Sequence, residues 1–514
     1  MIARVQSCLL QGIDALGCEV EVDLDERALT DKPNIVGLPD AGVRESLQRV
    51  RSAVLNSGFP WPEGSLLINL APAHMRKEGP VYDLPIALGT LIAQRALPPR
   101  AGDATAGGID ARTCVVAGEL ALDGRVRPIR GAIAMASLAR DLGFRSFICP
   151  AENAGEAAVV ESINVYGVRS LSEVVGLISG TAELEPAPAP DVAGMIASHA
   201  APIDFAEVRG QEAVKRALTI AAAGAHNALM LGPAGTGKTM MAKALPGILP
   251  PLTSEEALEI TRIYSAAGAL KPGESLVTSR PVRSPHHTAS AAAIVGGGVI
   301  PRAGEISLAH LGVLFLDELP EFGRSVLETL RQPLEDHVVT IARSHGSVRF
   351  PASFMLLAAM NPTPRGDVAP GAAGQREMDR YVGRLSGPLL DRIDVHVEAP
   401  AVPFNELSGK RPGTSTAQMK EAATIARERM VARQGPALPN ARLSGRQLDT
   451  LAPMEPAARD LTGQAIERLG LSARAYDKIR RVSRTIADLD GADTIDTPHV
   501  AEAVSYRLLD RRPA

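Results

Sequence analysis

The chain has 514 residues, a hydrophobic content of 45%, a charged content of 22% and a formal net charge of -4. Its length predicts two to four domains, and the near-average composition excludes a disordered or fibrous protein. The small negative charge excludes a global basic field, so any contact with nucleic acid must come from local basic patches.

The N-terminal segment mixes charged residues into its apolar run, unlike a signal peptide, and no stretch reaches about 18 apolar residues. Four cysteines without CxxC spacing occur in a chain long enough to fold without disulfides, namely Cys8, Cys18, Cys114 and Cys149. They are expected to be free thiols in a reducing compartment. We therefore expect a cytoplasmic protein with no membrane partner.

Residues 1–180 alternate between strand-like and helix-like patterns. The predicted strands cover 20–24, 66–70, 114–117 and 146–149. The predicted helices cover 41–57 and 84–94. This pattern predicts a compact α+β or α/β domain. Residues 181–203 are rich in Ala and Pro and lack a period, which is typical of a semi-rigid extended linker.

Residues 204–400 alternate helices with short buried strands, and residues 401–514 are helical almost throughout. In the first segment we expect helices over 211–225 and 239–248 and strands over 228–231, 313–316 and 354–360. Strands that feed helices in this way build a parallel sheet covered on both faces. In the second segment the expected helices cover 417–434, 456–468, 473–489 and 498–509. This segment is interpreted as a helical lid domain.

The segment GPAGTGKT matches the phosphate-binding pattern G-x-x-x-x-G-K-[ST] and lies between an apolar strand and a helix, as that chemistry requires. Its backbone N–H groups are expected to surround the phosphates of ATP. Lys238 would reach the β- and γ-phosphate oxygens, and Thr239 would offer its hydroxyl to Mg²⁺. The nucleotide-binding residues are thus expected to be Gly232, Pro233, Ala234, Gly235, Thr236, Gly237, Lys238 and Thr239.

Two further apolar strands are predicted to end in polar residues. The run VLFLDE ends in Asp317, expected to hold Mg²⁺ through water beside the phosphate loop, and Glu318, expected to polarise the attacking water. Two solvated acids at a strand end are the alternative. Asn361 ends the run SFMLLAAMN, where it is suited to sense the γ-phosphate or position the water. Alternatively, Asn361 begins the turn before Pro362.

Arg392 lies between two acidic residues in the segment SGPLLDRIDVHVE. Spacing alone favours an ion pair within the subunit, to Asp391 or Asp394. The other interpretation is that Arg392 stabilises transition-state charge in the active site of a neighbouring subunit.

Taken together, the phosphate loop, Asp317, Glu318, Asn361, GPLLDRID and SARAYDKIRRVSRTIADLDG resemble the magnesium-chelatase-like AAA+ ATPases, and within them the ComM/YifB family. The resemblance spans nearly the whole chain, including GLPDAGVRES and INLAPAHMRKEGPVYDLPIALG. It implies an α/β fold: an AAA+ P-loop core with a parallel sheet in αβα layers, an N-terminal Lon-protease-like α+β domain and a C-terminal helical lid. It also implies a homo-hexamer with nucleotide at the subunit interfaces, Arg392 as arginine finger and Arg474 as second sensor.

The same resemblance implies two insertions in the ATPase core, a helix-2 insert over 283–307 and a hairpin over 338–351 before the sensor strand. In related ring helicases, hairpins at these positions face the central pore. The polar side chains suited to following a phosphate backbone are Arg343, His345, Arg349, His286 and His287. An ordinary exposed hairpin is the alternative. The two adjacent histidines are expected to point in different directions, which argues against a metal site.

The N-terminal domain lacks the catalytic pair of the Lon-type peptidases that it resembles. Val81 in RKEGPVYD stands where the serine is expected, and Ile133 in RGAIAM stands where the lysine is expected. Without nucleophile or base the domain is expected to be a non-catalytic binding or assembly module. ComM-like chains commonly carry cysteines after the sensor asparagine, whereas this chain has none beyond Cys149. Because structural zinc needs four thiolate or imidazole ligands, the sequence argues against it.

The resemblance to ComM implies an ATP hydrolase and DNA helicase that promotes branch migration during recombination of transforming DNA. Its partner would be branched or single-stranded DNA. One alternative is a magnesium-chelatase-type motor subunit, although such subunits usually lack a Lon-like N-terminal domain. The other is a protein-remodelling AAA+ ATPase, because the phosphate loop does not encode what the pore engages.

Overall fold

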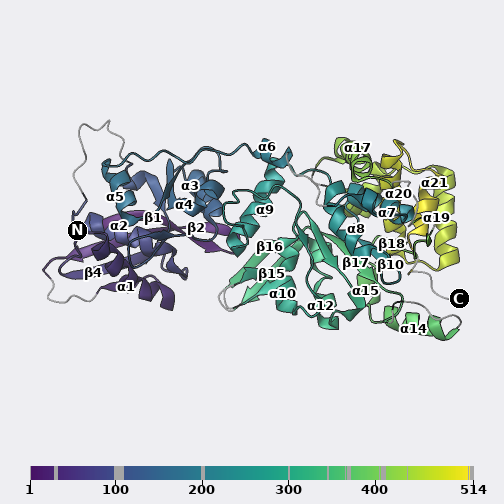
Figure 1. Cartoon of the computed structure of the whole chain (residues 1–514), viewed down its shortest axis with the longest axis horizontal. Helices are drawn as coiled ribbons and strands as arrows, with labels where there is room; N and C mark the ends of the chain where they lie inside the picture. Colours follow the sequence, from purple (N-terminus) through teal and green to yellow (C-terminus); the bar gives the residue numbers. More distant parts are fainter. Residues whose placement is uncertain are drawn as a thin grey trace. The chain divides into compact units, whose positions relative to one another are not determined.

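The computed structural model describes residues 2–27, 33–97, 109–197, 203–298, 301–343, 346–364, 366, 372–404, 406, 413–436, 438–507 and 509. The chain forms two compact units (Figure 1). The first comprises Met1–Met195 and Ser254–Val277, and the second comprises Ile196–Thr253 and Thr278–Ala514. Each unit has its own hydrophobic core. Residues 254–277 therefore group with the first unit, although their sequence lies inside the segment expected to form the ATPase core.

The first unit is built on a seven-stranded mixed sheet with the order β3-β4-β2-β1-β5-β8-β9. Its strands are β1 (Ile2–Gln11), β2 (Asp14–Asp25), β3 (Asn34–Val36), β4 (Ser65–Ala71), β5 (Cys114–Val116), β8 (Ser146–Pro150) and β9 (Asn164–Val168). β2 is antiparallel to both β1 and β4, whereas β5, β8 and β9 run parallel to one another. A separate ribbon pairs β6 (Glu119–Leu120) with β7 (Val126–Arg127). All four predicted strands of this region are confirmed.

The helices of the first unit pack on this sheet or on one another. They are α1 (Ala41–Asn56), α2 (Asp83–Ala93), α3 (Ala132–Asp141), α4 (Ala151–Ala157), α5 (Leu171–Ser179) and α9 (Ser254–Ala267). α1 and α2 confirm the two predicted helices. α9 contacts α3, and its Arg262 Nη2 lies 2.7 Å from Asp14 Oδ1 at the start of β2. Helix α6 (Val192–Ala197) spans the division between the units.

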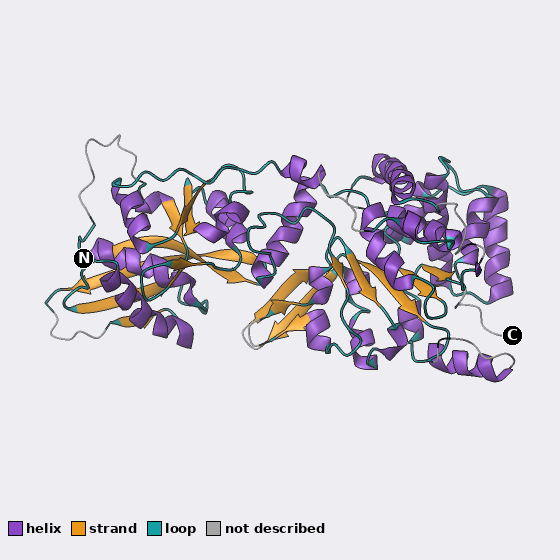
Figure 2. Cartoon of the chain, viewed as in Figure 1, coloured by secondary structure: helices purple, strands orange, loops and turns teal. Residues whose placement is uncertain are grey.

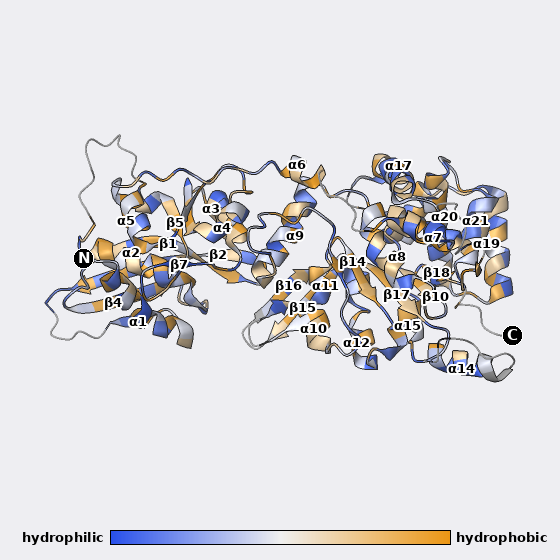
Figure 3. Ribbon diagram, in the orientation of Figure 1, coloured by the Kyte–Doolittle hydropathy of each residue, from blue (hydrophilic) through white to orange (hydrophobic). Residues whose placement is uncertain are grey.

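The second unit contains a five-stranded parallel sheet with the order β11-β14-β17-β10-β18. Its strands are β10 (Ala228–Leu231), β11 (Val282–Arg283), β14 (Val313–Leu316), β17 (Met355–Met360) and β18 (Val395–Glu398). β10, β14 and β17 are buried along their whole length, and β14 and β17 are coloured as hydrophobic in Figure 3. The predicted parallel sheet is confirmed. It could be predicted because strands that are covered on both faces have continuous apolar sequences.

The second unit also contains helices and two small ribbons. The helices that precede β18 are α7 (Glu212–Gly224), α8 (Lys238–Ala244), α10 (Ala291–Val295), α11 (Glu305–Leu308), α12 (Arg324–Thr329), α13 (Pro333–Asp336), α14 (Ala372–Val382) and α15 (Gly387–Leu390). The ribbons are β12 (Gly296–Gly297) with β13 (Arg302–Ala303), and β15 (Val338–Arg343) with β16 (Gly346–Pro351). The predicted hairpin over 338–351 thus corresponds to β15 and β16.

The C-terminal region is helical in its described residues (Figure 2). Its helices are α17 (Thr416–Gln434), α18 (Gly445–Leu451), α19 (Pro456–Leu469), α20 (Ala473–Leu489) and α21 (Thr497–Ser505). α17 and α20 both contact α7, so these helices share the core of the second unit. In the described ranges, no helix combines the length and the apolarity that crossing a membrane requires. The four cysteines are buried free thiols, as their spacing predicts.

Candidate nucleotide site

The predicted phosphate loop joins β10 to α8 and depends on glycine at three positions. Gly235 and Gly237 have φ values of 81° and 87°, the left-handed region in which side chains with a Cβ are strained. At Gly232 an added Cβ would lie 2.1 Å from the carbonyl oxygen of Ala399, which follows β18. The loop therefore takes its shape because glycine permits both the turn and this close approach.

Lys238 is buried within the loop, with its side chain directed at oxygen atoms. Its Nζ donates to the carbonyl oxygens of Gly232 and Pro233, both at 2.6 Å, and to Asn361 Oδ1 at 3.1 Å. Burial lowers the pKa of the Lys238 ammonium, and the charge of Asp317 opposes that shift. The structure thus brings together two predicted residues from separate strand ends.

Thr239 and Asp317 also meet at this edge of the sheet. Thr239 Oγ1 donates to Asp317 Oδ2 at 2.7 Å, and the backbone N–H of Glu318 donates to Asp317 Oδ1 at 3.0 Å. β17 lies between β14 and β10, so Asp317 reaches the phosphate loop across the end of β17. The carboxyl ends of parallel strands form the usual ligand crevice of such sheets.

These side chains fit Mg²⁺ and a triphosphate. A hydroxyl and a carboxylate side by side are the oxygen ligands that Mg²⁺ prefers, and a buried ammonium on a glycine-rich loop suits phosphate oxygens. Among the described residues, no group of three His, Cys, Asp or Glu side chains is arranged to hold a metal ion alone. The Thr239 hydroxyl and the Asp317 carboxylate suit a Mg²⁺ ion that binds together with the nucleotide.

Gln211 is a contact of the phosphate loop that the sequence interpretation missed. It has a left-handed φ of 60°, and its Nε2 donates to Pro400 O at 2.7 Å and Thr236 O at 3.4 Å. Its Oε1 is buried without a hydrogen-bond partner. An unpaired buried acceptor beside the loop fits a donor group on a bound nucleotide. The only sequence signal was a polar residue directly before a helix.

Glu318 contacts His287, a residue that the sequence assigned only to the DNA-facing insert. His287 Nδ1 lies 3.2 Å from Glu318 Oε2, and the His287 ring meets Phe322 edge-on at 6.4 Å between centroids. The rings of His286 and His287 lie 4.1 Å apart with a tilt of 36°. The prediction that they point in different directions is wrong, because the strand that precedes them has ended and the turn brings both rings to one side.

Arg392 has a carboxylate partner within the subunit, but not one that spacing indicated. Its Nη2 forms an ion pair with Glu335 of α13, and its Nη1 donates to Pro388 O at 2.6 Å. The prediction of Asp391 or Asp394 as partner is wrong for the described residues. Asp394 is instead paired with Lys478, and the side chain of Arg392 turns toward α13.

Arg474, the predicted second sensor, lies in the first turn of α20. Its side chain is exposed, and its Nη1 is 3.9 Å from Asp391 Oδ2. The structure therefore places Arg474 beside the residue that precedes Arg392. This proximity links two predicted site residues that are far apart in the sequence.

The hairpin β15–β16 carries the predicted DNA contacts. Arg349 is exposed on β16 and pairs in register with Thr340 on β15. The backbone of Arg343 ends β15, whereas its side chain, like the whole of His345, lies outside the described residues. Arg349 is thus the one predicted hairpin contact whose surroundings can be described.

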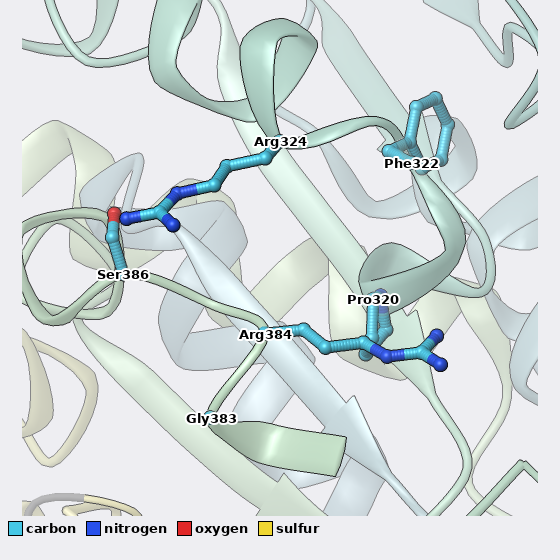
Figure 4. A pocket seen from close by; sticks show the side chains of 6 residues that line it. All are labelled: Pro320, Phe322, Arg324, Gly383, Arg384 and Ser386. Carbon is cyan, nitrogen blue, oxygen red and sulfur yellow. The ribbon is translucent and has the colours of Figure 1, made fainter. Parts of the chain in front are cut away.

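A hollow of about 320 Å³ opens between the segment after Glu318 and the segment before Arg392. Its lining comprises Pro320, Phe322, Arg324, Gly383, Arg384 and Ser386. Figure 4 shows the Arg324 side chain extended toward Ser386, with the Arg384 side chain directed elsewhere. Arg384 Nη1 lies 2.9 Å from Glu321 Oε1, so its charge is already paired.

Three family profiles of the magnesium chelatase subunit ChlI match successive parts of the chain. The profile "Magnesium chelatase, subunit ChlI" matches residues 204–407, "Subunit ChlI of Mg-chelatase" matches 20–153, and the ChlI C-terminal profile matches 413–507. With the five-stranded parallel sheet and the phosphate loop, these matches define a ChlI-type AAA+ ATPase, a class that uses ATP and Mg²⁺.

Relatives that align over nearly the whole chain identify the family within this class. The chain is 44% identical to YifB of Salmonella typhimurium and 42% identical to the competence protein ComM of Haemophilus influenzae, in each case over 99% of this chain and 98% of the relative. The magnesium-chelatase 38 kDa subunit of Rhodobacter capsulatus is 28% identical over 38% of this chain and 59% of its own length. The chain belongs to the ComM/YifB family, whose members carry magnesium-chelatase ChlI-like domains.

Proposed function

We propose that the protein is an ATP-driven DNA motor, a hexameric helicase that promotes branch migration during recombination of transforming DNA. The observation that carries this proposal is the 42% identity to the competence protein ComM over nearly the full length of both chains. A magnesium-chelatase motor subunit is less well supported, because the Rhodobacter capsulatus 38 kDa subunit aligns with only 38% of the chain at 28% identity, whereas ComM aligns with 99% at 42%.

In the proposed ATPase site each residue has one role. Bound Mg²⁺·ATP supplies the γ-phosphoryl group whose transfer to water is the reaction. Lys238 would neutralise charge on phosphate oxygens, Thr239 would offer its hydroxyl to Mg²⁺, and Asp317, which accepts from that hydroxyl at 2.7 Å, would hold Mg²⁺ through water. Glu318 accepts a proton from the attacking water, and Asn361 orients that water.

In the proposed ring, Arg392 of one subunit completes the site of the next. A positive charge brought to the transferring phosphoryl group stabilises its transition state. Arg392 Nε is buried without a hydrogen-bond partner in the described structure, so its pairing within the subunit is incomplete. Arg474 would act from the lid on the nucleotide of its own subunit.

The proposed domains are 1–180, 181–203, 204–400 and 401–514, with a Lon-protease-like fold for the first; residues 254–277 of the third pack with the first unit. Val81 and Ile133, at the positions of the peptidase serine and lysine, are 9% and 0% exposed and belong to the hydrophobic core of the first unit. Their apolar, buried side chains support a non-catalytic domain, which we propose is an assembly or binding module of a cytoplasmic protein. The β15–β16 hairpin would face the pore and contact DNA phosphates.

The test is ATP-dependent unwinding of forked and four-way-junction DNA at low and high salt. Because phosphate contacts release counterions, DNA affinity must fall with salt, by a slope of about 0.9 per contact on logarithmic axes. Arg349→Ala should reduce that slope by about one contact and weaken binding to all sequences alike. Arg459→Ala, an exposed arginine on α19, is the matched control and should leave the slope unchanged.

The same assay separates the motor proposal from its alternatives. DNA-stimulated ATP hydrolysis with strand separation supports a DNA motor. An active ATPase that no DNA stimulates at low salt would contradict it and favour a protein-remodelling ATPase. Equal slopes for both arginine variants would remove Arg349 from the DNA surface while leaving the motor proposal intact.

A further inference from the structure

The turn that carries Arg392 is held through its backbone by side chains from three other segments. Asn227 Nδ2 donates to Arg392 O at 2.8 Å, and Lys478 Nζ donates to Ile393 O at 3.1 Å. Arg507 Nη1 donates to Ile393 O at 2.7 Å and to Asp394 O at 3.1 Å. Each carbonyl of residues 392–394 therefore accepts a hydrogen bond from a side chain distant in the sequence.

The negative charge of Asp394 lies close to these donors. Its Oδ1 lies 3.2 Å from Lys478 Nζ, its Oδ2 lies 3.5 Å from His226 Nδ1, and its Oδ2 accepts from the backbone N–H of Asn227 at 3.2 Å. Asp394 is 5% exposed, Lys478 6% and Arg507 1%. Burial by itself raises the pKa of Asp394, but the charge of Lys478, the hydrogen bond and charge of His226 and the charge of Arg481 together outweigh it and hold that pKa below its ordinary value.

Asn227 and Lys478, two of the residues whose side chains bond the backbone of the turn, lie beside or on elements that also carry the proposed nucleotide contacts. Asn227 directly precedes β10, the strand that leads into the phosphate loop. Lys478 lies on α20 one turn after Arg474, and residues four apart share a helix face. Arg474 Nη1 approaches Asp391 Oδ2 at 3.9 Å, so the same face of α20 contacts both ends of the turn.

The side chain of Arg392 is held less firmly than its backbone. Its Nη1 donates to Pro388 O at 2.6 Å, but its Nη2 pairs with Glu335, whose own side chain is 62% exposed, and its Nε is buried without a hydrogen-bond partner in the described residues. An exposed partner holds an arginine weakly, because water competes for both charges. The backbone of the turn is thus fixed, whereas the Arg392 guanidinium can leave Glu335 for another partner.

We propose that Asn227, Lys478 and Arg507 are positioning residues that tie the Arg392 turn to the phosphate-loop strand and to the lid helix of the same subunit. A change in that subunit's nucleotide site would then move Arg392 relative to the neighbouring subunit's site. This inference rests on the proposed function, in which Arg392 acts on the neighbour. The simpler alternative is a buried polar cluster that only stabilises the fold.

Mixed assemblies distinguish the two interpretations. Asn227→Asp keeps the acceptor for the Leu356 N–H, held at 2.8 Å, and removes the donor to Arg392 O. Lys478→Met removes the positive charge that pairs with Asp394 and the donor to Ile393 O. Each variant alone should lose roughly 10- to 100-fold in ATP turnover, because misplacing a catalytic group by about 1 Å has that effect. ATP binding by the variant's own site should be retained.

Adding Lys238→Met subunits, which lack their own turnover but present an intact Arg392, should restore turnover to the variant sites. Adding Arg392→Ala subunits should not, since those subunits supply no guanidinium. A cluster that only stabilises the fold predicts no such difference between the two additions. Lys478→Arg, which preserves a cationic donor, should retain more turnover than Lys478→Met.

The inference is overturned if both variants hydrolyse ATP at the wild-type rate, or if Lys238→Met subunits rescue Arg392→Ala but neither positioning variant. Thermal unfolding and ATP binding are measured on each variant. If Lys478→Met does not fold, Asn227→Asp decides, because Asn227 is only partly buried and keeps its contact to β17. Full activity of Arg392→Ala alone would instead contradict the proposed role of Arg392.

Discussion

The two compact units each bury a lysine whose ammonium donates to backbone carbonyl oxygens. In the first unit Lys77 is fully buried and its Nζ donates to Pro72 O. In the second, Lys238 is 7% exposed and its Nζ donates to Gly232 O and Pro233 O. Burial lowers the pKa of both ammonium groups. By burial and pKa alone the two residues are alike.

The residues around the two lysines differ, and this difference distinguishes a structural lysine from a candidate site lysine. Lys77 lies near Cys18, and burial raises the pKa of the Cys18 thiol to about 11. Lys238 lies at the carboxyl edge of a parallel sheet, in contact with Asn361 and near Asp317. A perturbed lysine therefore marks a candidate site only where other polar side chains converge on it.

The largest expected effect tests this contrast directly. Lys238→Met should reduce ATP turnover by about 100- to 1000-fold or more, because one charge-stabilising donor contributes on that scale. Lys77→Met should leave turnover per folded molecule unchanged. Steady-state ATPase assays on the two variants, normalised to the folded fraction, measure both. Comparable losses in the two variants would break the distinction between the lysines.

The next effect concerns the pair Glu318 and His287. Glu318→Gln should lower turnover by about 100-fold, the lower end of the range for general acid–base groups, while ATP binding is retained. His287→Ala should lower it only about 2- to 5-fold, since a partly exposed contact such as this is worth little. Single-turnover hydrolysis and ATP-binding titrations check both. Wild-type turnover of Glu318→Gln would remove Glu318 from the proton transfer.

Two glycines of the phosphate loop should differ in their tolerance of alanine. Gly232→Ala places a methyl group 2.1 Å from Ala399 O, so we expect a loss of about 2 to 3 kcal/mol in stability. Gly235→Ala meets no atom within 4 Å and should cost only about 1 kcal/mol from its positive φ. Chemical denaturation measures the difference, and the reverse order would show that the loop adopts another shape.

The smallest effect is a pH dependence from Lys77. Its pKa in the folded state is below the ordinary value of 10.5, so between the two values the unfolded chain binds more protons. Wild-type stability should consequently rise with pH relative to Lys77→Met as pH approaches 10.5, and the difference should be constant at lower pH. Urea unfolding over that pH series tests the sign. A difference that falls with rising pH would contradict the assigned burial effect.

Much of the local structure followed from the sequence because its signals are local. Apolar runs such as 228–231 and 313–316 predicted the buried strands β10 and β14 with their observed bounds. The partners of Arg392 could not be predicted in this way. Neighbouring charges suggested Asp391 or Asp394, but the turn directs the guanidinium to Glu335 of α13.

The sequence by itself determined that this chain carries a phosphate loop on an alternating strand and helix segment, because glycine conformations and apolar periodicity are encoded within a few residues. Only the tertiary structure decided which side chains meet. The contacts of Lys238 with Asn361, Thr239 with Asp317 and His287 with Glu318 depend on strand order. The tertiary structure likewise decided the place of α9. This helix packs on α3 of the first unit, where its apolar face is buried, although its sequence lies within the ATPase segment.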